Sequence, residues 1–423
     1  MSVTEQHDGR PVAALSNVLR TLPERYLGGP QGFDVTYHFV LTDIGRTWEV
    51  RLTELQARVR EGASRRADAT IGTTAQTWLE LLRGDANGIE AFFAQRLWAR
   101  GDLDLALAFD GLVLRPDGTP PTTRIHRVGP PRREISALTL GSGPDVVLLH
   151  GLGSSKVSFF ATAARLRHDY RVHALDLPGF GSSAKPAGAA YDARYFADAV
   201  LTYLETEGIG SAHLVGNSMG GRVALELALS QPERVRTVAL LCPAVAFVER
   251  QLHPLVRLAR PELGTLPHRL RHASVERQLS RMFGDPGAID PRLAQLAVDE
   301  FQRIYRSPRA RYAFLKAARN IYLDAPFGPR GFYPRLADLR APALFVWGSR
   351  DPLISPGLAR PVAEWLPRAE QIVLDGCGHV PQIERPEQTV GLLRRLFSGA
   401  DALGDGTRGP RFTRVARASA IAA

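Results

Sequence analysis

The sequence predicts an α/β protein with a doubly wound, mostly parallel sheet and a helical lid, preceded by a small α+β domain. Apolar runs of strand length alternate with helical patterns over the C-terminal two thirds of the chain. About a hundred residues with helical spacing separate Cys242 from Leu344, where a crossover usually needs about a dozen or more, which indicates an inserted lid. Proline and glycine crowd at Arg115–Thr122, between two regions with their own periodicity.

These patterns predict four parts. Residues 12–113 form the α+β domain, because "GFDVTYHFVL" and "RTWEVRLTE" alternate like strands and the following segment passes from strand to helix and back. Residues 114–121 form the linker, and residues 122–398 form the α/β domain, with the lid at about 246–336. The basic, small-residue stretch at 399–423 is predicted to be a disordered tail.

Six apolar runs in the larger domain have strand length, and such runs are typical of parallel strands buried on both faces. They are "DVVLLHG", "YRVHALDLPG", "AHLVGNS", "RTVALLCPA", "APALFVWGS" and "EQIVLDGCGH". Segments such as "YDARYFADAVLTYLETEG" and "GGRVALELALSQPERV" between them have helical spacing. The lid should include the helical patterns "VERQLHPLVRLAR" and "PRLAQLAVDEFQRIY".

The charge and composition exclude several classes of protein. The net charge is +10, but it comes from arginines scattered through helical patterns, which indicates solvated helix faces and no nucleic-acid partner. The absence of an apolar run of about eighteen residues indicates no integral membrane association. The polar start "MSVTEQHDGR" and a total of two cysteines, Cys242 and Cys377, favour a cytoplasmic protein without disulfides, metal or other cofactor.

The stretch "LVGNSMGGRVALELA" holds the first candidate catalytic residue, Ser218. A nucleophilic serine on a sharp strand-to-helix turn needs small residues two positions away on either side, so that strand and helix can pack closely. Gly216 and Gly220 meet this demand. The alternative is a small polar residue at the end of an ordinary strand.

Two more strand ends carry chemistry, because Asp351 follows "LFVWGSR" and His379 follows "IVLDGCG". Ligands of such a sheet bind beyond the carboxyl ends of its strands. A serine hydroxyl becomes nucleophilic when a histidine takes its proton and a carboxylate orients that histidine. We therefore predict a triad of Ser218, Asp351 and His379, with Asp375 as a less favoured alternative to Asp351.

The run "LLHGLGSS" places another loop after an earlier strand, where a backbone N–H can face a developing oxyanion. Leu152 and Met219 are the predicted amide donors of this oxyanion hole, one from each loop. Because the backbone amides act, the side chains of these two residues should have little effect on catalysis.

The motifs "HGLG", "DLPGFGSS", "GNSMGG", "WGSRDPLIS" and "GCGHVPQIERPE" resemble the successive signatures of the α/β-hydrolase superfamily over residues 122–398. The resemblance implies a serine hydrolase with the triad Ser218, Asp351 and His379. A carboxylic ester with an apolar part is the expected small-molecule substrate, cleaved through an acyl-enzyme.

Two alternatives to an esterase stay open. One is C–C bond hydrolysis or acyl transfer on the same fold, since "GNSMGG" also resembles C–C hydrolases of ring-cleavage products. Val380, however, follows the histidine where those enzymes usually have tryptophan. The other is a lipid-binding carrier protein with an inactive hydrolase domain.

Residues 12–113 resemble the sterol carrier protein 2 family in "DATIGTTAQTWLELLRGDAN" and "AFFAQRLWARGDLDLALAF", where Gly101 and Asp102 match the end of a family pattern. Arg96 and Ala99 depart from the commonest residues of that pattern. The resemblance implies a tunnel for a fatty-acyl or sterol ligand. The candidate lining residues are Trp78, Leu82, Phe92, Phe93 and Leu97, and the alternative is that they only fill the core of a small domain.

Overall fold

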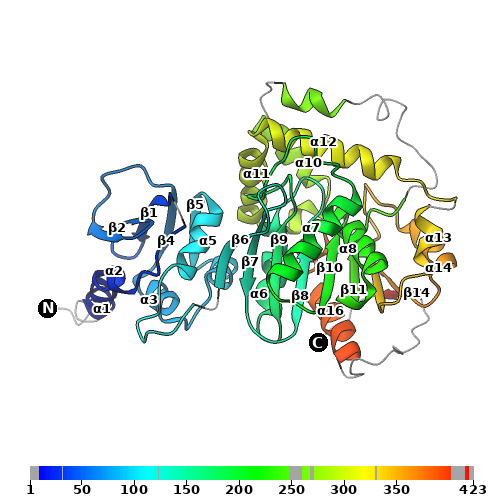
Figure 1. Cartoon of the computed structure of the whole chain (residues 1–423). Helices are drawn as coiled ribbons and strands as arrows, with labels where there is room; N and C mark the ends of the chain where they lie inside the picture. The colour runs from blue at the N-terminus through cyan, green and yellow to red at the C-terminus, as the bar shows by residue number, and fades with distance from the viewer. Residues whose placement is uncertain are drawn as a thin grey trace. The chain divides into compact units, whose positions relative to one another are not determined.

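Two β-sheets organise the chain, each with its own helices (Figure 1). The computed structural model describes residues 9–30, 32–121, 123–246, 260–266, 271–328, 331–401 and 415–418. By internal contacts, residues 1–126 with 138–141 form one compact unit, and residues 127–137 with 142–423 form the other. The predicted fold class, a mostly parallel α/β sheet preceded by a small α+β unit, is confirmed. None of the helices in the described ranges combines the length and the apolar character that a membrane span requires.

The first unit is built on a five-stranded sheet in the order β3-β2-β1-β4-β5. Strand β1 pairs antiparallel with β2 and parallel with β4, so the sheet is mixed. Its core contains buried aromatic and aliphatic side chains from the sheet and from α1 and α3. The elements are α1 (Gly9–Arg20), α2 (Leu22–Arg25), β1 (Asp34–Leu41), β2 (Arg46–Thr53), β3 (Ala57–Glu61), β4 (Ala69–Thr73), α3 (Ala75–Arg83), α4 (Gly88–Phe93), β5 (Leu97–Gly101) and α5 (Leu103–Gly111).

Polar caps and one glycine set the element boundaries of this unit. The side chains of Thr74, Asn87 and Asp102 accept hydrogen bonds from first-turn amides of α3, α4 and α5. Gly101 has a φ of +87°, and a Cβ there would lie 2.3 Å from the carbonyl oxygen of Asp68. The Gly101–Asp102 pair therefore ends β5 and starts α5.

Most strands of a nine-stranded sheet, in the order β14-β13-β12-β11-β10-β8-β9-β7-β6, belong to the second unit. Strands β8 to β13 all pair in parallel. Helices α7 and α8 pack against each other, and α6 packs against α16. The strands are β6 (Thr123–Val128), β7 (Ile135–Leu140), β8 (Asp145–Leu149), β9 (Arg171–Asp176), β10 (Ala212–Asn217), β11 (Val235–Leu241), β12 (Ala343–Gly348), β13 (Glu370–Leu374) and β14 (Val415–Ala418).

The helices that connect these strands follow the predicted alternation. Strands β8, β10 and β12 are mainly apolar and almost wholly buried, as parallel strands with covered faces require. The connecting elements are η1 (Lys156–Phe159), α6 (Phe160–Leu166), α7 (Ala193–Thr206), α8 (Met219–Ser230), η2 (Pro232–Arg234), η5 (Pro356–Leu358), α14 (Ala359–Trp365), α15 (Pro381–Glu384) and α16 (Pro386–Asp401).

The long insertion between β11 and β12 is helical in its described part. Its helix α11 coincides with the predicted pattern "PRLAQLAVDEFQRIY". The other predicted pattern, "VERQLHPLVRLAR", lies almost entirely in 247–259, outside the described residues. The described elements of the insertion are η3 (Pro261–Thr265), α10 (His272–Ser280), η4 (Pro286–Ala288), α11 (Pro291–Tyr305), α12 (Pro308–Leu323) and α13 (Phe332–Leu336).

The structure differs from the predicted disordered tail at two places. Helix α16 continues to Asp401, and Val415–Ala418 form β14, which pairs in parallel with β13. The basic, small-residue composition of the tail favours disorder, but a sheet edge offers backbone hydrogen bonds to almost any sequence. The other residues of the tail, 402–414 and 419–423, lie outside the described part of the chain.

Candidate active site

Ser218 occupies the turn between β10 and α8 and has a strained backbone, with φ of 51° and ψ of −115°. A Cβ on Gly216 would lie 2.3 Å from the backbone of Gly220, and a Cβ on Gly220 would lie 2.0 Å from the carbonyl oxygen of Leu149. Strand, turn and helix are therefore packed so closely that the two flanking glycines have no room for a side chain. The sharp strand-to-helix turn expected at Ser218 is therefore present.

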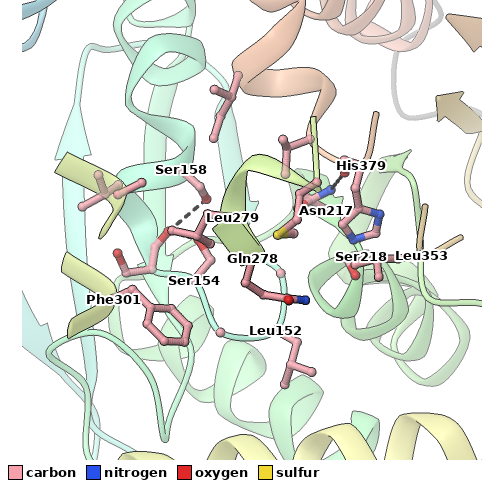
Figure 2. Close-up of a pocket in the computed structure, with 18 of the residues that line it drawn as sticks. Leu152, Ser154, Ser158, Asn217, Ser218, Gln278, Leu279, Phe301, Leu353 and His379 are labelled. Atoms are coloured by element: carbon pink, nitrogen blue, oxygen red, sulfur yellow. Dashed lines mark hydrogen bonds between the residues drawn. The ribbon is translucent and has the colours of Figure 1, made fainter. Parts of the chain in front are cut away.

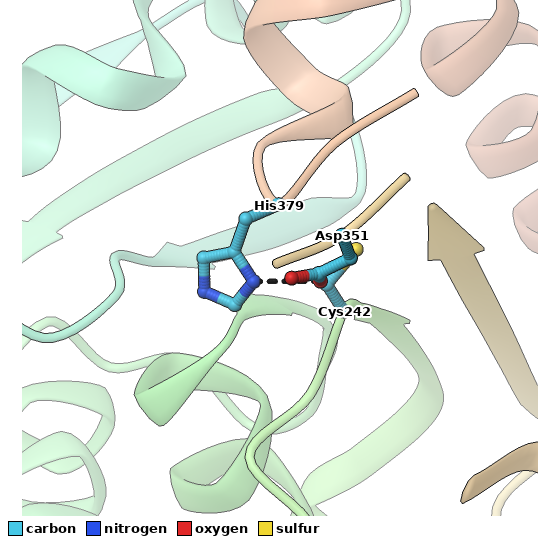
Figure 3. A group of neighbouring side chains, drawn as sticks. All are labelled: Cys242, Asp351 and His379. Carbon is cyan, nitrogen blue, oxygen red and sulfur yellow. Dashed lines mark hydrogen bonds and ion pairs between the residues drawn. The ribbon is translucent and has the colours of Figure 1, made fainter. Parts of the chain in front are cut away.

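His379 and Asp351 form a hydrogen-bonded pair at the carboxyl ends of β13 and β12. The distance between His379 Nδ1 and Asp351 Oδ2 is 2.7 Å (Figure 3). The other carboxylate oxygen of Asp351 accepts hydrogen bonds from the amides of Leu353 at 2.8 Å and Ile354 at 2.9 Å. The carboxylate is thus held by its own loop, and it orients the imidazole with Nε2 left for another partner.

Ser218 and His379 face the same cavity, which has a volume of about 480 Å³ (Figure 2). The structure therefore brings together the three side chains that the strand ends predicted. Asp375, the alternative acid, is exposed and accepts a hydrogen bond from Ser349 Oγ at 3.1 Å. Asp351, not Asp375, is the partner of the histidine.

The loop after β8 lies against the nucleophile turn. A Cβ on Gly151 would lie 3.0 Å from Asn217 Oδ1 and 3.3 Å from Ser218 Cβ. Leu152 lines the cavity, and Met219 is the first residue of α8, so its amide is one of those that no carbonyl of the helix can satisfy. Both amides belong to segments that border Ser218, as an oxyanion hole requires.

His150 holds the shape of this loop. Its Nδ1 lies 2.8 Å from the carbonyl oxygen of Gly151, and its Nε2 accepts a hydrogen bond from the amide of Leu177 at 3.0 Å. Burial lowers the pKa of His150, which favours the neutral ring that can donate at one nitrogen and accept at the other. His150 is thus a structural histidine of the loop.

The lid lines the cavity with mainly apolar side chains. The residues Leu279, Met282 and Phe283 near the end of α10, Leu293 and Phe301 of α11, and Phe314 and Ile321 of α12 line it together with the catalytic loops. One buried carboxylate, Glu300, also lines it, and both its oxygens accept from Arg303 at 2.8 and 2.9 Å. A substrate with an apolar body fits this lining better than a charged one.

Cys242, Asp351 and His379 also form a cluster of possible metal-ligand atoms, all within 4.8 Å of one another (Figure 3). The direct hydrogen bond between His379 Nδ1 and Asp351 Oδ2 occupies the two atoms that a shared cation would need. Burial raises the pKa of the Cys242 thiol, which disfavours the thiolate that binds metals. The donor set fits a hydrogen-bonded catalytic pair better than a metal centre.

Two residues that hydrogen-bond to the loops of Ser218 and His379 could not be singled out from the sequence. Asn217 Nδ2 donates to the carbonyl oxygens of Leu241 and His379, both at 3.0 Å, and so ties the nucleophile turn to the histidine loop (Figure 2). The Glu384 carboxylate accepts hydrogen bonds from the amide of Gly378, the residue before the histidine. The signal that the sequence offered was that Asn217 directly precedes Ser218 in "GNSMGG" and that Glu384 belongs to the same motif as His379, "GCGHVPQIERPE".

The five candidate lipid-binding residues occupy two environments in the first unit. Trp78 and Leu82 are buried in its core, and Leu97 packs against that core. Phe92 and Phe93 are half-buried on α4 and contact each other edge to face. Trp78 stacks on Phe39, and its Nε1 is buried with no hydrogen-bond partner in the described part of the chain.

A parallel sheet whose strand ends bring together a strained serine and a histidine–carboxylate pair defines the α/β class of hydrolases. Comparison with known proteins agrees. The model of the alpha/beta hydrolase fold family matches residues 144–386, and that of the SCP-2 sterol transfer family matches residues 31–114. The chain belongs to the alpha/beta hydrolase fold family and carries an N-terminal SCP2 domain.

Similar proteins include esterases and C–C hydrolases. The chain is 29% identical over 264 residues to a pimeloyl-[acyl-carrier protein] methyl ester esterase of Aeromonas salmonicida (strain A449), with 62% of this chain and 98% of the relative covered. It is 28% identical over 275 residues to a 2-hydroxymuconate semialdehyde hydrolase of Pseudomonas sp. (strain CF600), with 62% and 89% covered. A solved membrane phospholipase A matches with a TM-score of 0.56 and 28% identity, over 66% of this chain and 87% of that one.

Proposed function

We propose that the chain hydrolyses a carboxylic ester with an apolar acyl or alcohol part, through an acyl-enzyme on Ser218. The observation that carries this proposal is the strained Ser218 beside the His379–Asp351 pair, at the wall of a mainly apolar cavity. The pimeloyl methyl ester esterase among the relatives acts on an ester, which adds support.

In the proposed reaction His379 Nε2 accepts the proton of Ser218 while Oγ attacks the ester carbonyl carbon. The carbonyl oxygen becomes an oxyanion, which the amides of Leu152 and Met219 would stabilise. The C–O bond to the alcohol then breaks, and His379 returns the proton to the leaving oxygen. Water repeats the sequence on the acyl-enzyme, with His379 as the base, and releases the acid and free Ser218.

The proposal is tested with p-nitrophenyl esters of increasing chain length and with a fluorophosphonate that labels activated serines. We expect the wild type to hydrolyse these esters and to be labelled at Ser218. Ser218→Ala should abolish labelling and lower kcat by about 10³-fold or more, because nucleophile and base act as one unit. His379→Ala should be nearly as damaging. Retention of more than about a tenth of the activity in Ser218→Ala would refute the mechanism.

A second candidate is C–C bond hydrolysis, which the 2-hydroxymuconate semialdehyde hydrolase among the relatives favours. Val380 after the histidine weighs against it. Product analysis with a ring-cleavage dienoate discriminates the two reactions, and added alcohols or thiols as acceptors reveal acyl transfer. A chain that is folded but unlabelled by the fluorophosphonate would point instead to a carrier protein with an inactive hydrolase domain.

For the SCP2 domain we propose a fatty-acyl or sterol ligand in contact with Trp78, Leu82, Phe92, Phe93 and Leu97. The family match and the buried, unpaired indole N–H of Trp78 support this assignment. Binding of fluorescent fatty-acyl or sterol probes to residues 1–114 tests it.

A further inference from the structure

The turn of the lid after α10, residues 282–284, lies against the loop that carries His379, and one backbone hydrogen bond joins the two segments. The amide of His379 donates to the carbonyl oxygen of Met282 at 2.7 Å. A Cβ on Gly378 would lie 2.4 Å from that same oxygen, and a Cβ on Gly284 would lie 2.2 Å from the carbonyl oxygen of Gly376. The two backbones therefore run in direct contact, with glycines where they meet.

One buried side chain holds both backbones. Glu384, at the end of α15, accepts from the amide of Gly284 at 2.7 Å with Oε2, and from the amide of Gly378 at 3.0 Å with both oxygens. Arg350 also contacts the lid turn, since its Nη1 donates to the carbonyl oxygen of Gly284 at 3.4 Å. Two amides that have no carbonyl acceptor within the described part of the chain are thus satisfied by one carboxylate.

The two segments in contact carry His379 and also form part of the cavity wall. Met282 and Phe283 of the lid turn line the cavity, and His379 lines it from the other segment. A displacement of the lid turn would therefore move a wall of the cavity and release the backbone that orients the imidazole. A misplacement of a reacting group by about 1 Å is enough to cost on the order of 10²-fold in rate.

We propose that Glu384 is a positioning residue that couples the seated lid to the alignment of His379, so that the base is in place only while the lid turn is docked. This inference concerns the same site as the proposed function and rests on it. It adds a role that neither the strand-end triad nor the oxyanion hole supplies, because Glu384 touches no reacting atom and acts through the amides of Gly378 and Gly284.

The test measures the rate and the final extent of fluorophosphonate labelling of Ser218 in the full-length chain. Glu384→Ala removes both acceptors, and we expect labelling to slow by about tenfold or more while the final extent stays that of the wild type. A lower labelling rate with an unchanged final extent of labelling indicates a misaligned base. A loss of folded protein would instead lower the final extent. On an ester, the loss should fall on kcat and leave KM within about threefold.

Two further variants make the result specific. Glu384→Gln can keep an oxygen at the Oε2 position, which accepts from both amides, so it should recover most of the labelling rate. Glu387→Ala is the matched control, since Glu387 is exposed and pairs with Arg165 at the surface; its rate should equal that of the wild type. The methyl group of Gly284→Ala would collide with the carbonyl of Gly376 and push the lid turn away from the histidine loop. The double variant Gly284→Ala/Glu384→Ala should therefore label no more slowly than the slower of the two single variants.

Equal rates for the wild type and Glu384→Ala would overturn the proposal, as would equal losses in the alanine and glutamine variants or additive losses with Gly284→Ala. Labelling does not require ester turnover. A wild type that is labelled but cleaves no ester refutes the proposed reaction alone, and a wild type that is not labelled refutes both proposals.

Discussion

The Asp351 carboxylate divides its two oxygens between two partners. Oδ1 accepts from the amides of Leu353 and Ile354, and Oδ2 faces Nδ1 of His379. Because the loop holds Oδ1, the carboxylate cannot turn away from the ring. This arrangement favours the tautomer of the neutral imidazole with its proton on Nδ1, which would leave Nε2 as the acceptor for Ser218 in the proposed reaction.

Asp351→Asn should invert this arrangement. The amide oxygen of asparagine will stay on the two loop amides, so its NH₂ group will donate to His379 Nδ1 and move the ring proton to Nε2. We expect kcat to fall by about 10³- to 10⁴-fold with the fold unchanged, as judged by circular dichroism. Asp375→Asn, at the exposed carboxylate beside Ser349, is the control and should stay within twofold, on the order expected of a surface change. A large loss in the control instead would show that the acid is misassigned.

Strand β10 leads into the candidate active site at its carboxyl end and lies in the buried core at its amino end. Its carboxyl end leads into Ser218, while His213 near its start is fully buried. His213 Nδ1 lies 2.9 Å from Thr237 Oγ1, and Nε2 lies 3.2 Å from Asp401 Oδ1. Burial lowers the pKa of His213, and this effect outweighs the attraction of Asp401, which would raise it.

This lowered pKa predicts how stability depends on pH. In the unfolded chain a histidine takes up a proton below about pH 6.5, whereas buried His213 stays neutral to a lower pH. The unfolded state then binds more protons, so the free energy of unfolding should decrease as the pH falls below about 6.5. We expect a loss on the order of 1 kcal/mol between pH 7 and pH 5, measured by urea unfolding. His213→Gln should show a smaller loss over that interval; an identical slope in the variant would contradict the assignment.

At the scale of the whole molecule, one chain carries a hydrolase domain and an SCP2 domain. A ligand bound by one domain is kept at high effective concentration for the other when both are on one chain. Long-chain esters have low free concentrations in water, since each methylene favours leaving water by about 0.8 kcal/mol. Delivery can therefore limit the turnover of long esters, whereas short soluble esters need no carrier.

A shortened chain that begins at Pro121 tests this idea, because it keeps β6 and every later strand. We expect it to hydrolyse a butyrate ester as the full-length chain does and to lose kcat/KM on a long-chain ester. Residues 1–114 alone should bind fluorescent fatty-acyl or sterol probes. The decisive quantity is the ratio of kcat/KM for long and short esters, and an unchanged ratio in a folded, shortened chain would reject delivery by the N-terminal domain.

The local pattern of the sequence was enough to predict the α/β class, the insertion of a helical lid and the order of the residues at the strand ends. These features depend on short-range rules: apolar runs make buried parallel strands, and a serine between glycines permits a turn with φ of 51°. The same reasoning failed at Val415–Ala418, because pairing with a sheet edge depends little on side chains.

The tertiary structure alone decided which distant groups hold the candidate catalytic residues in place. Asn217 reaches the carbonyl of His379, and Glu384 joins Gly378 to Gly284 of the lid, across separations of 162 and 100 residues. The periodicity of apolar residues does not predict such contacts, because each one depends on where a distant segment of the chain lies in the folded protein. Residue types and strand order thus predicted which side chains meet at the strand ends, whereas the packing of the lid turn against the histidine loop decided how His379 is held.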